Sequence, residues 1–327
     1  MKLKLRKGLN LSIKGFVDAS AKPVKAAAPA LCAIVPDDYP GFVPKVAVKE
    51  GDTVSPGQPL LFDKNHPDVK LVSPVSGTVR SVVRGERRKI LRVEVVPVAE
   101  SLPQTTFAKA VDSKSARSLL AQSGLLALMR QRPYDIVPNP DEAVVRDIFV
   151  TALDTAPLAF PIAEMASMMF DKADLEAGVA LLSKITVGKV YLSHGEDWKF
   201  GAIAGAEDVT VEGPHPSGNV GVQIANIKPV DKGDIVWTLD VITLGRIGRL
   251  AAKGELDFRA LVAVTGPEVK SPKLIETVVG APVEGLIKGN IVEDGLNHRV
   301  ISGNVFTGVA VDAADGFLRY PYRQITV

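Results

Sequence analysis

One loop combines residue types whose spacing could support binding chemistry. It places a histidine between prolines and glycines, in the order Gly213, Pro214, His215, Pro216, Ser217, Gly218. A rigid loop of this kind can hold backbone amides at fixed orientations near a bound group, and a histidine can exchange a proton near neutral pH. The loop matches neither the P-loop nor the dinucleotide-binding glycine pattern. The sequence predicts a binding loop, with a histidine simply packed between prolines as the alternative.

Two further polar segments follow apolar runs that are typical of buried parallel strands. Asp154 and Thr155 come after the run 147–153, and Ser193, His194 and Gly195 end the run 188–193. Ligands of open α/β sheets bind outside the carboxyl ends of the strands. These loops are therefore predicted to face a ligand or partner surface, with no catalytic residue and no metal ligand set.

A single cysteine limits the metal and redox chemistry of the chain. Cys32 has no second cysteine with which to form an internal disulfide, an iron–sulfur site or a zinc site built on several thiolates. It stands within the apolar run 31–35, so we expect a buried thiol rather than a nucleophile.

The segment 46–83 predicts a small all-β unit. Two β-prone runs each close on a glycine turn, at Gly51 and at Gly77, and the pair resembles the two halves of the biotinyl/lipoyl barrel-sandwich fold. Carrier domains of that fold present a lysine between the halves, so Lys64 is a candidate modification site. Its neighbours do not match the carrier sequence, which favours a scaffold without a swinging arm.

The hydrophobic period changes from two to 3.6 near residue 108. A helix is predicted from an N-cap at Asp112 through Met129, ending at Pro133, and further helices at 172–184 and 240–250. With strands at 147–153, 188–193 and 208–211, this pattern predicts right-handed βαβ units in a Rossmann-like parallel sheet.

The two ends of the chain are again predicted to be β-rich. Residues 1–15 should form two short strands around a turn at Gly8, followed by a linker at 19–30. Strands at 259–266, 299–303 and 324–327 with a short helix at 271–279 predict a β-grasp-like, SLBB-type module. We expect a multidomain α/β plus β chain with a barrel-sandwich domain at 1–105, a Rossmann-like domain at 106–254 and the β-grasp-like domain at 255–327.

Composition excludes some classes of protein. The 327 residues contain no apolar run long enough for a membrane-spanning helix and no secretion signal. Residues 1–100 carry 17 Lys and Arg against 10 Asp and Glu, which leaves 22 against 27 in the remainder. The basic first third could face an anionic partner or a lipid surface, or could be a solvated face.

Several motifs together resemble the A subunit of the bacterial sodium-translocating NADH:quinone reductase. They span the chain in the family's order, at 6–11, at the turn around Gly77, at 151–159, at Gly213–Gly218 and at 301–304. The resemblance implies a peripheral subunit on the cytoplasmic face of the inner membrane, related in fold to the C subunit of the Rnf complex and to the flavoprotein subunit of complex I. Its partners would be the other subunits, including membrane subunits, of a translocase that uses flavins, an iron–sulfur cluster, NADH and ubiquinone, without nucleic acid.

The chain also departs from those relatives. They carry a glycine-rich flavin loop after the first α/β helix, where this chain has bulky side chains from Leu125 to Met129 that block close backbone approach. We also expect the chain to lack the C-terminal helical region of the family. We expect a subunit that binds no cofactor itself, is inactive in isolation, and contributes to assembly and to the quinone site. The alternatives are a flavin- or NADH-binding oxidoreductase acting alone and a lipoyl-like carrier.

Overall fold

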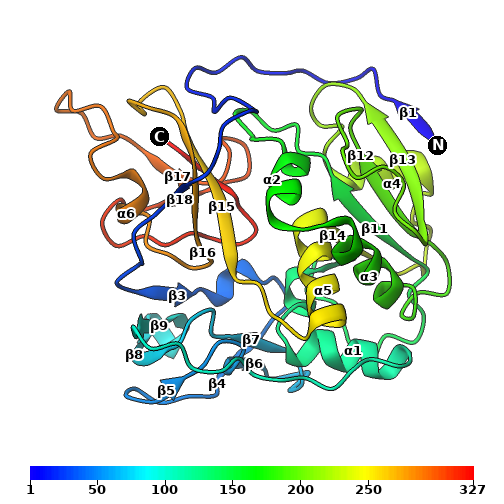
Figure 1. The fold of residues 1–327 in the computed structure, drawn as a ribbon, viewed down its shortest axis with the longest axis horizontal. Helices are drawn as coiled ribbons and strands as arrows, with labels where there is room; N and C mark the ends of the chain where they lie inside the picture. The colour runs from blue at the N-terminus through cyan, green and yellow to red at the C-terminus, as the bar shows by residue number, and fades with distance from the viewer.

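The computed structural model describes residues 1–327. The chain folds into three lobes (Figure 1). The first lobe is all β, the second places helices on a largely parallel sheet, and the third is again mostly β. The predicted fold class is confirmed. The predicted domain ends at 105 and 254 fall between β9 and α1 and directly after α5.

The first lobe is a sandwich of two small sheets. One sheet has the order β3-β9-β8-β5 and the other β4-β6-β7. A side chain at Gly77, where β8 begins, would overlap the backbone of Val96, so this turn needs glycine. Lys64 directly follows β6 and is exposed. The elements are β3 (Cys32–Ile34), η1 (Pro36–Asp38), β4 (Pro44–Val46), β5 (Thr53–Val54), β6 (Pro59–Asp63), β7 (Lys70–Val72), β8 (Gly77–Arg84), η2 (Glu86–Arg88) and β9 (Ile90–Pro97).

The central sheet has the order β1-β13-β12-β11-β14-β10. Its inner strands pair in parallel, and only β10 is antiparallel. The predicted strands at 147–153, 188–193 and 208–211 are confirmed. Strand β11 is buried along almost its whole length, as expected for a strand covered on both faces of the sheet, whereas burial alternates along the last residues of β13. The strands are β1 (Lys2–Lys4), β10 (Arg130–Arg132), β11 (Asp147–Ala152), β12 (Val190–His194), β13 (Ala206–Glu212) and β14 (Val236–Asp240).

Five α-helices and one 3-10 helix accompany this sheet. Three of them begin at an aspartate whose carboxylate accepts a backbone N–H of the first turn, namely Asp112, Asp171 and Asp240. The helix predicted to run from Asp112 through Met129 is too long, because it ends at Gln122 and a separate turn follows. The helices are α1 (Ser113–Gln122), η3 (Leu126–Leu128), α2 (Ile162–Met169), α3 (Lys172–Leu182), α4 (Val220–Ile227) and α5 (Val241–Lys253).

Helices α3 and α5 cross at unusually close range. A Cβ atom at Gly248 would overlap the carbonyl oxygen of Asp174, and one at Gly178 would lie 2.6 Å from the carbonyl oxygen of Leu244. Glycine is therefore required at this crossing, which explains why α5 contains glycines despite their low helix propensity.

The third lobe contains a sheet with the order β18-β17-β19-β15-β16-β2. The prediction of a helix at 271–279 is wrong, because these residues form strand β16. Leu274 and Ile275 on this strand are buried where it pairs along the whole length of β15, and tertiary pairing decides the conformation. The elements are β2 (Val24–Lys25), β15 (Arg259–Thr265), β16 (Lys273–Val278), α6 (Glu284–Ile287), β17 (Val300–Ser302), β18 (Val309–Val311) and β19 (Gln324–Thr326).

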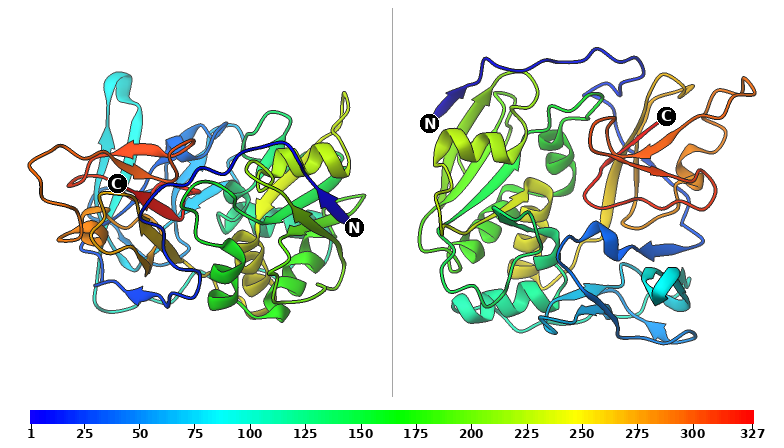
Figure 2. Two further views of the ribbon diagram at one scale, coloured as in Figure 1. Left: turned by 90° about the horizontal axis from the view of Figure 1, so that it is seen from above. Right: turned by 180° about the vertical axis from the view of Figure 1, so that it is seen from behind.

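The N-terminal segment links the second and third lobes. Strand β1 joins the edge of the central sheet beside β13, and β2 joins the edge of the third lobe's sheet beside β16. Of the two short strands predicted at 1–15, the first is confirmed and the second is wrong, because residues 5–15 form no strand. Residues 5–17, which we name the strap, cross the face seen from above in Figure 2. No helix in the structure combines the length and the apolar character that a bilayer crossing requires.

Candidate functional site

The two predicted loops meet at the carboxyl ends of the central strands. Thr155 follows β11, and its Oγ1 accepts a hydrogen bond from the backbone N–H of Gly218 at 3.0 Å. The same hydroxyl lies 3.2 Å from Nδ1 of His215. Parallel strands bring their carboxyl ends to one edge, and this edge joins Asp154 and Thr155 to the Gly213–Gly218 loop.

Close backbone contacts fix the shape of this loop. A Cβ atom at Gly218 would lie 2.7 Å from the backbone nitrogen of Thr155, so the approach of the two loops needs glycine. The Ser217 hydroxyl donates to the carbonyl of Gly213 at 2.8 Å, and the Gln223 amide donates to the carbonyl of Ser217 at 3.1 Å. The loop is held internally, without any ligand.

The hydrogen bonds at Thr155 favour one tautomer of His215. Because Thr155 Oγ1 already accepts the Gly218 N–H, its own proton is free to point at Nδ1 of His215. A neutral imidazole then carries its proton on Nε2, which has no hydrogen-bond partner within the chain. The site thus presents one N–H donor.

A cleft of about 260 Å³ lies beside these loops. Phe160, Ile162 and Met165 form an apolar part of its wall on the side of the central lobe. The third lobe supplies the opposite wall, where the ring of Phe306 stacks on His215 with centroids 5.3 Å apart. The cleft therefore combines an aromatic face with a few polar groups, which suits a flat, partly polar ligand.

Two carboxylates in the cleft have different environments. Asp154 keeps an exposed edge, yet the surrounding protein withdraws its carboxylate from bulk solvent and raises its pKa. Burial would also raise the pKa of Asp240, but the Arg323 guanidinium 2.6 Å away and the N–H of Thr243 outweigh burial and lower it. Asp240 is therefore a charged structural anchor, and Asp154 is the carboxylate closer to neutralisation.

The loop that follows β12 does not reach this cleft. His194 is buried, with Nε2 2.9 Å from Asp208 and Nδ1 2.7 Å from the carbonyl oxygen of Gly195. Its ring also stacks on Trp198. The prediction that Ser193, His194 and Gly195 line the site is wrong, because these contacts hold the histidine within the domain.

A second cavity, of about 100 Å³, lies between all three lobes, and sequence reasoning missed it. Its lining is mostly apolar, but Arg246 on α5 reaches it while only 6% exposed. Its Nη2 donates to the carbonyl of Arg259 at 2.6 Å, and its Nε has no partner. Burial lowers the pKa of this arginine. In the sequence, the only sign of this cavity is the charged Arg246 within the largely apolar segment 240–250.

Aromatic residues from two lobes close one side of this second cavity. Tyr39 and Tyr320 stack with centroids 5.5 Å apart and nearly parallel rings. The Tyr320 hydroxyl donates to the carbonyl of Leu128, and the Arg319 side chain pairs with Asp38 at 2.6 Å. These contacts tie the third lobe to the first two.

The region predicted to obstruct a flavin is largely buried. Leu126 and Met129 are fully buried, and Leu125 is nearly so. Gly124 lies against the barrel lobe, where a Cβ atom would come within 3.2 Å of Val72. The same turn also borders the second cavity, which Gly124, Leu125 and Leu128 help to line. Its aliphatic side chains replace the run of glycines that close approach of a nucleotide phosphate to the backbone needs.

Cys32 lies in strand β3 and is 1% exposed, which confirms the prediction of a buried thiol. Burial raises the pKa of this thiol to about 12. Cys32 is therefore a small apolar core residue rather than a nucleophile.

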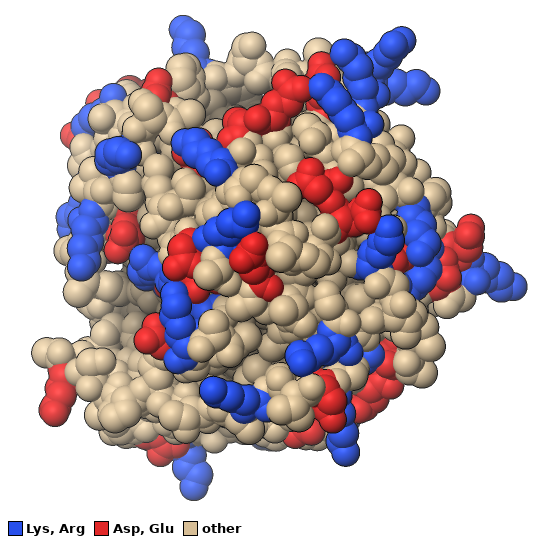
Figure 3. Space-filling model, turned by 45° about the vertical axis from the view of Figure 1, so that its right-hand side comes forward, with Lys and Arg blue, Asp and Glu red and all other residues tan.

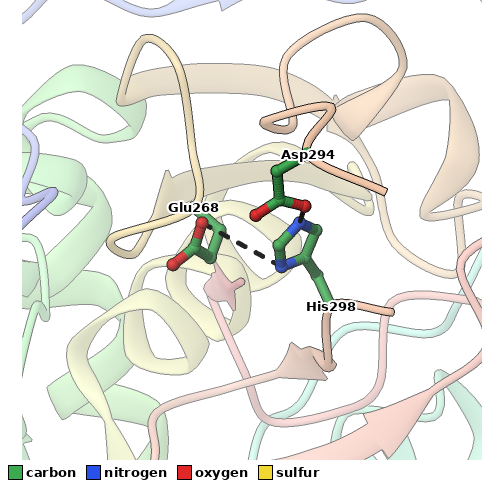
Figure 4. Close-up of side chains that lie close together, drawn as sticks. All are labelled: Glu268, Asp294 and His298. Carbon is green, nitrogen blue, oxygen red and sulfur yellow. Dashed lines mark hydrogen bonds and ion pairs between the residues drawn. The ribbon is translucent and has the colours of Figure 1, made fainter. Parts of the chain in front are cut away.

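Glu268, Asp294 and His298 form a cluster that was not predicted, with potential ligand atoms within 4.8 Å of one another. Figure 4 shows the two imidazole nitrogens directed at different carboxylates. Nε2 lies 2.9 Å from Asp294 and Nδ1 lies 4.0 Å from Glu268. The carboxylates thus face separate edges of the ring, which suits a hydrogen-bonded clamp of the 289–298 loop better than a shared ion.

On one face of the molecule, charge does not mark a large binding surface. On the side drawn in Figure 3, acidic and basic side chains alternate over the surface rather than separating into two fields. The clefts, rather than the overall charge, therefore define the candidate site.

Comparison with known families gives matches along most of the chain. Residues 3–97 match the NqrA N-terminal barrel-sandwich hybrid domain, residues 111–256 the NqrA second alpha/beta domain, and residues 261–313 the NQRA C-terminal domain. Similar proteins include the A subunits of the Na⁺-translocating NADH-quinone reductases of Klebsiella pneumoniae (strain 342), 35% identical, and of Pasteurella multocida (strain Pm70), 37% identical. Each alignment covers 99% of this chain and 73% or 72% of the relative.

Among solved structures, an NAD⁺-reducing [NiFe]-hydrogenase in the air-oxidized state shows a partial likeness. It covers 57% of this chain and 41% of that chain, with 14% identity and a TM-score of 0.38.

Proposed function

The chain belongs to the family of the A subunits of Na⁺-translocating NADH-quinone reductases, and we propose that it is a subunit without a redox group that contributes to the quinone site. Members of this family are parts of an NADH:quinone oxidoreductase complex that transports sodium. The other subunits are its partners, and we place it at the cytoplasmic face of the membrane. Electrons would pass through partner subunits that hold the flavins and the iron–sulfur cluster.

The buried aliphatic side chains of Leu125, Leu126 and Met129, where a flavin-binding relative would have glycines, support a chain without its own flavin. The single buried thiol of Cys32 supports a chain without its own iron–sulfur cluster. Assembly of the complex is then the main task of this protein. The alternative, a flavin-binding oxidoreductase acting alone, predicts a yellow purified protein, whereas our proposal predicts no absorbance in the flavin bands.

The cleft beside Thr155 and His215 is the observation that carries the quinone proposal. A quinone head group is flat and has two carbonyl acceptors, so it needs one or two donors in an otherwise apolar site. His215 offers an Nε2–H donor, and Phe306 offers a stacking face. Asp154 and Gly218 also line this cleft, and Gly213, Pro214 and Pro216 would extend the quinone or partner surface beyond it as part of the same loop.

The cavity around Arg246 is a second candidate position for the head group. The unpaired Nε–H of Arg246 supplies a donor, and the stacked rings of Tyr39 and Tyr320 supply a flat apolar wall. This is the same combination as in the first cleft. The two positions differ in the residues that a bound quinone would touch, so one experiment can separate them.

A photoreactive quinone in the assembled complex tests both positions. Crosslinks near Thr155, His215 and Phe306 would support the first cleft, and crosslinks near Tyr39, Arg246 and Tyr320 would support the second. Two matched variants add a kinetic test. His215→Gln should raise the KM for quinone if the first cleft binds the head group. Arg246→Gln should raise the KM for quinone if the second cavity binds it. Labels that map only to other subunits, with unchanged KM in both variants, would refute a contribution of this chain to the quinone site.

A further inference from the structure

The strap is fixed to the molecule along most of its length. The N–H of Leu5 donates to Glu212 at 2.8 Å, and that of Leu9 donates to the carbonyl of His215 at 2.9 Å. The carbonyl of Gly15 accepts the N–H of Gly266 at 2.9 Å in the third lobe. The strap therefore connects the central and third lobes through hydrogen bonds and is not a free tail.

Two glycines let the strap lie directly on the protein backbone. Gly8 has φ of 145°, and a Cβ atom there would overlap the carbonyl oxygen of His215. Gly15 has φ of 87°, and a Cβ atom there would overlap the carbonyl oxygen of Gly266. Since the backbone itself makes the contact, the side chains between these points are free to face away from the lobes.

Large apolar side chains on the strap are exposed rather than packed. Leu9 is 68% exposed, Leu11 42% and Phe16 67%. Single exposed apolar residues are ordinary, but three within eight positions of a fixed segment form a patch that indicates an interaction surface.

The charges on the strap are all basic and all unpaired. Arg6, Lys7 and Lys14 are exposed, none lies within ion-pair distance of a carboxylate, and residues 5–17 contain no acidic residue. The neighbouring Lys2 and Lys4 differ, because they pair with Glu196 and Glu212. The strap thus joins three unneutralised cations to three exposed apolar groups.

We propose that the strap docks the protein on a surface of anionic phospholipids. Leu9, Leu11 and Phe16 enter the boundary between head groups and acyl chains. The three cations meet lipid phosphates, and attraction of this kind adds up over basic residues near an anionic surface. This inference rests on the proposed position of the protein beside the membrane of a sodium-translocating complex.

The mixture of basic and apolar side chains on the strap favours a lipid surface over a binding pocket on a partner protein. Exposed basic residues stand at both ends of an extended segment, with exposed apolar side chains between and beside them. Binding to a partner protein needs shape complementarity between two surfaces. Binding to an anionic membrane needs only basic side chains next to apolar side chains that can insert between the lipids.

Co-sedimentation of the full chain with vesicles tests the proposal. Binding is expected to phosphatidylcholine vesicles that contain phosphatidylglycerol, with little binding to phosphatidylcholine alone and a steep loss at high salt. The triple variant Arg6→Gln/Lys7→Gln/Lys14→Gln should weaken binding on the order of 100-fold. Leu9→Ser/Phe16→Ser should weaken it without changing the net charge.

A matched control removes three exposed basic residues elsewhere. Arg84→Gln/Arg87→Gln/Arg88→Gln alters the tip between β8 and β9 and changes the net charge equally. This control should bind vesicles nearly as the natural chain does. Equal losses in control and strap variants, or no binding to anionic vesicles, would overturn the proposal.

Assembly in detergent distinguishes a protein partner from lipid. If the strap variants fail to join the other subunits in lipid-free detergent while vesicle binding is unaffected, the strap is an interface between subunits and the lipid proposal is wrong. Failure of the quinone proposal would appear separately, in the crosslinks and the KM values, and would leave the vesicle result standing.

Discussion

Asp240 and Arg323 form an ion pair across the boundary between the central and third lobes, with Nη2 2.6 Å from Oδ2. Asp240 also caps α5 through the N–H of Thr243, 2.8 Å from Oδ1. The carboxylate of Asp240 therefore caps the start of α5 and also holds the third lobe in position beside the cleft that His215 lines.

Removing the charge of Asp240 should loosen the two lobes without removing the cap. Asp240→Asn keeps an N-cap oxygen but leaves the guanidinium of Arg323 unpaired, and breaking a largely buried pair in this way costs about 3–5 kcal/mol. Urea unfolding should show an earlier first transition. In a double-mutant cycle with Arg323→Met, losses that simply add would argue against coupling of the two groups.

Thr155→Val should disturb the candidate site locally. The change leaves the N–H of Gly218 without an acceptor and removes the donor to His215, at a cost of about 1–3 kcal/mol in unfolding free energy. Nitrogen NMR of the imidazole should show loss of the single Nε2–H tautomer. Thr155→Ser retains the hydroxyl and should restore both readouts, and an unchanged spectrum in Thr155→Val would contradict the assigned hydrogen bond.

Gly248→Ala should be strongly destabilising because the new methyl group would overlap the backbone of α3 at Asp174. We expect a loss of about 3 kcal/mol or more by thermal or urea unfolding. Gly221→Ala provides the matched control: Gly221 also lies in a helix, a Cβ atom there has no neighbour within 4 Å, and stability should rise by up to about 1 kcal/mol. Similar effects at both glycines would refute the close crossing.

Asp174 should make the fold sensitive to acid. Burial raises the pKa of this carboxyl, but Lys253 and Arg249 outweigh burial and lower it below the ordinary value of 3.8. A lowered folded pKa stabilises the protein above about pH 4, and this contribution disappears as the pH falls through the folded pKa. The unfolding free energies of the natural chain and Asp174→Asn should differ at pH 7 and converge in acid. A constant difference down to about pH 3, below the ordinary pKa of an aspartate, would contradict the assignment.

Cys32 should resist modification while the chain is folded. With a pKa of about 12, only about one thiol in 10,000 is ionised at pH 8, and the side chain is buried. A chromogenic disulfide reagent should react only when the chain unfolds in denaturant. Rapid reaction of the folded chain would show that β3 opens readily.

The sequence predicted elements whose pattern and neighbours agree. The strands at 147–153 and 188–193 are rich in apolar and β-prone residues, and the helices at 172–184 and 240–250 begin with capping aspartates. The meeting of Thr155 with Gly218 follows from parallel strand ends. Elements that depend on distant partners were missed. Residues 271–279 are a strand because β15 pairs with them, and residues 8–15 stay extended because Gly266 and His215 hold them.

The Arg246 cavity was also beyond prediction, because three lobes build it and no single segment carries its pattern. Its one sequence sign, an arginine within an apolar helix, becomes informative only when the unpaired Nε is seen. His194 shows the opposite case, since its position after a strand suggested a site and its bonds to Asp208 and Gly195 turn it inward.

The edge positions of β1 and β2 have a consequence for biosynthesis. Strand β1 pairs with β13 at Thr210–Glu212, and β2 pairs with β16 at Ile275–Glu276. Both strands leave the ribosome about 200 residues or more before their partners, so this early segment is among the last parts to reach its final place.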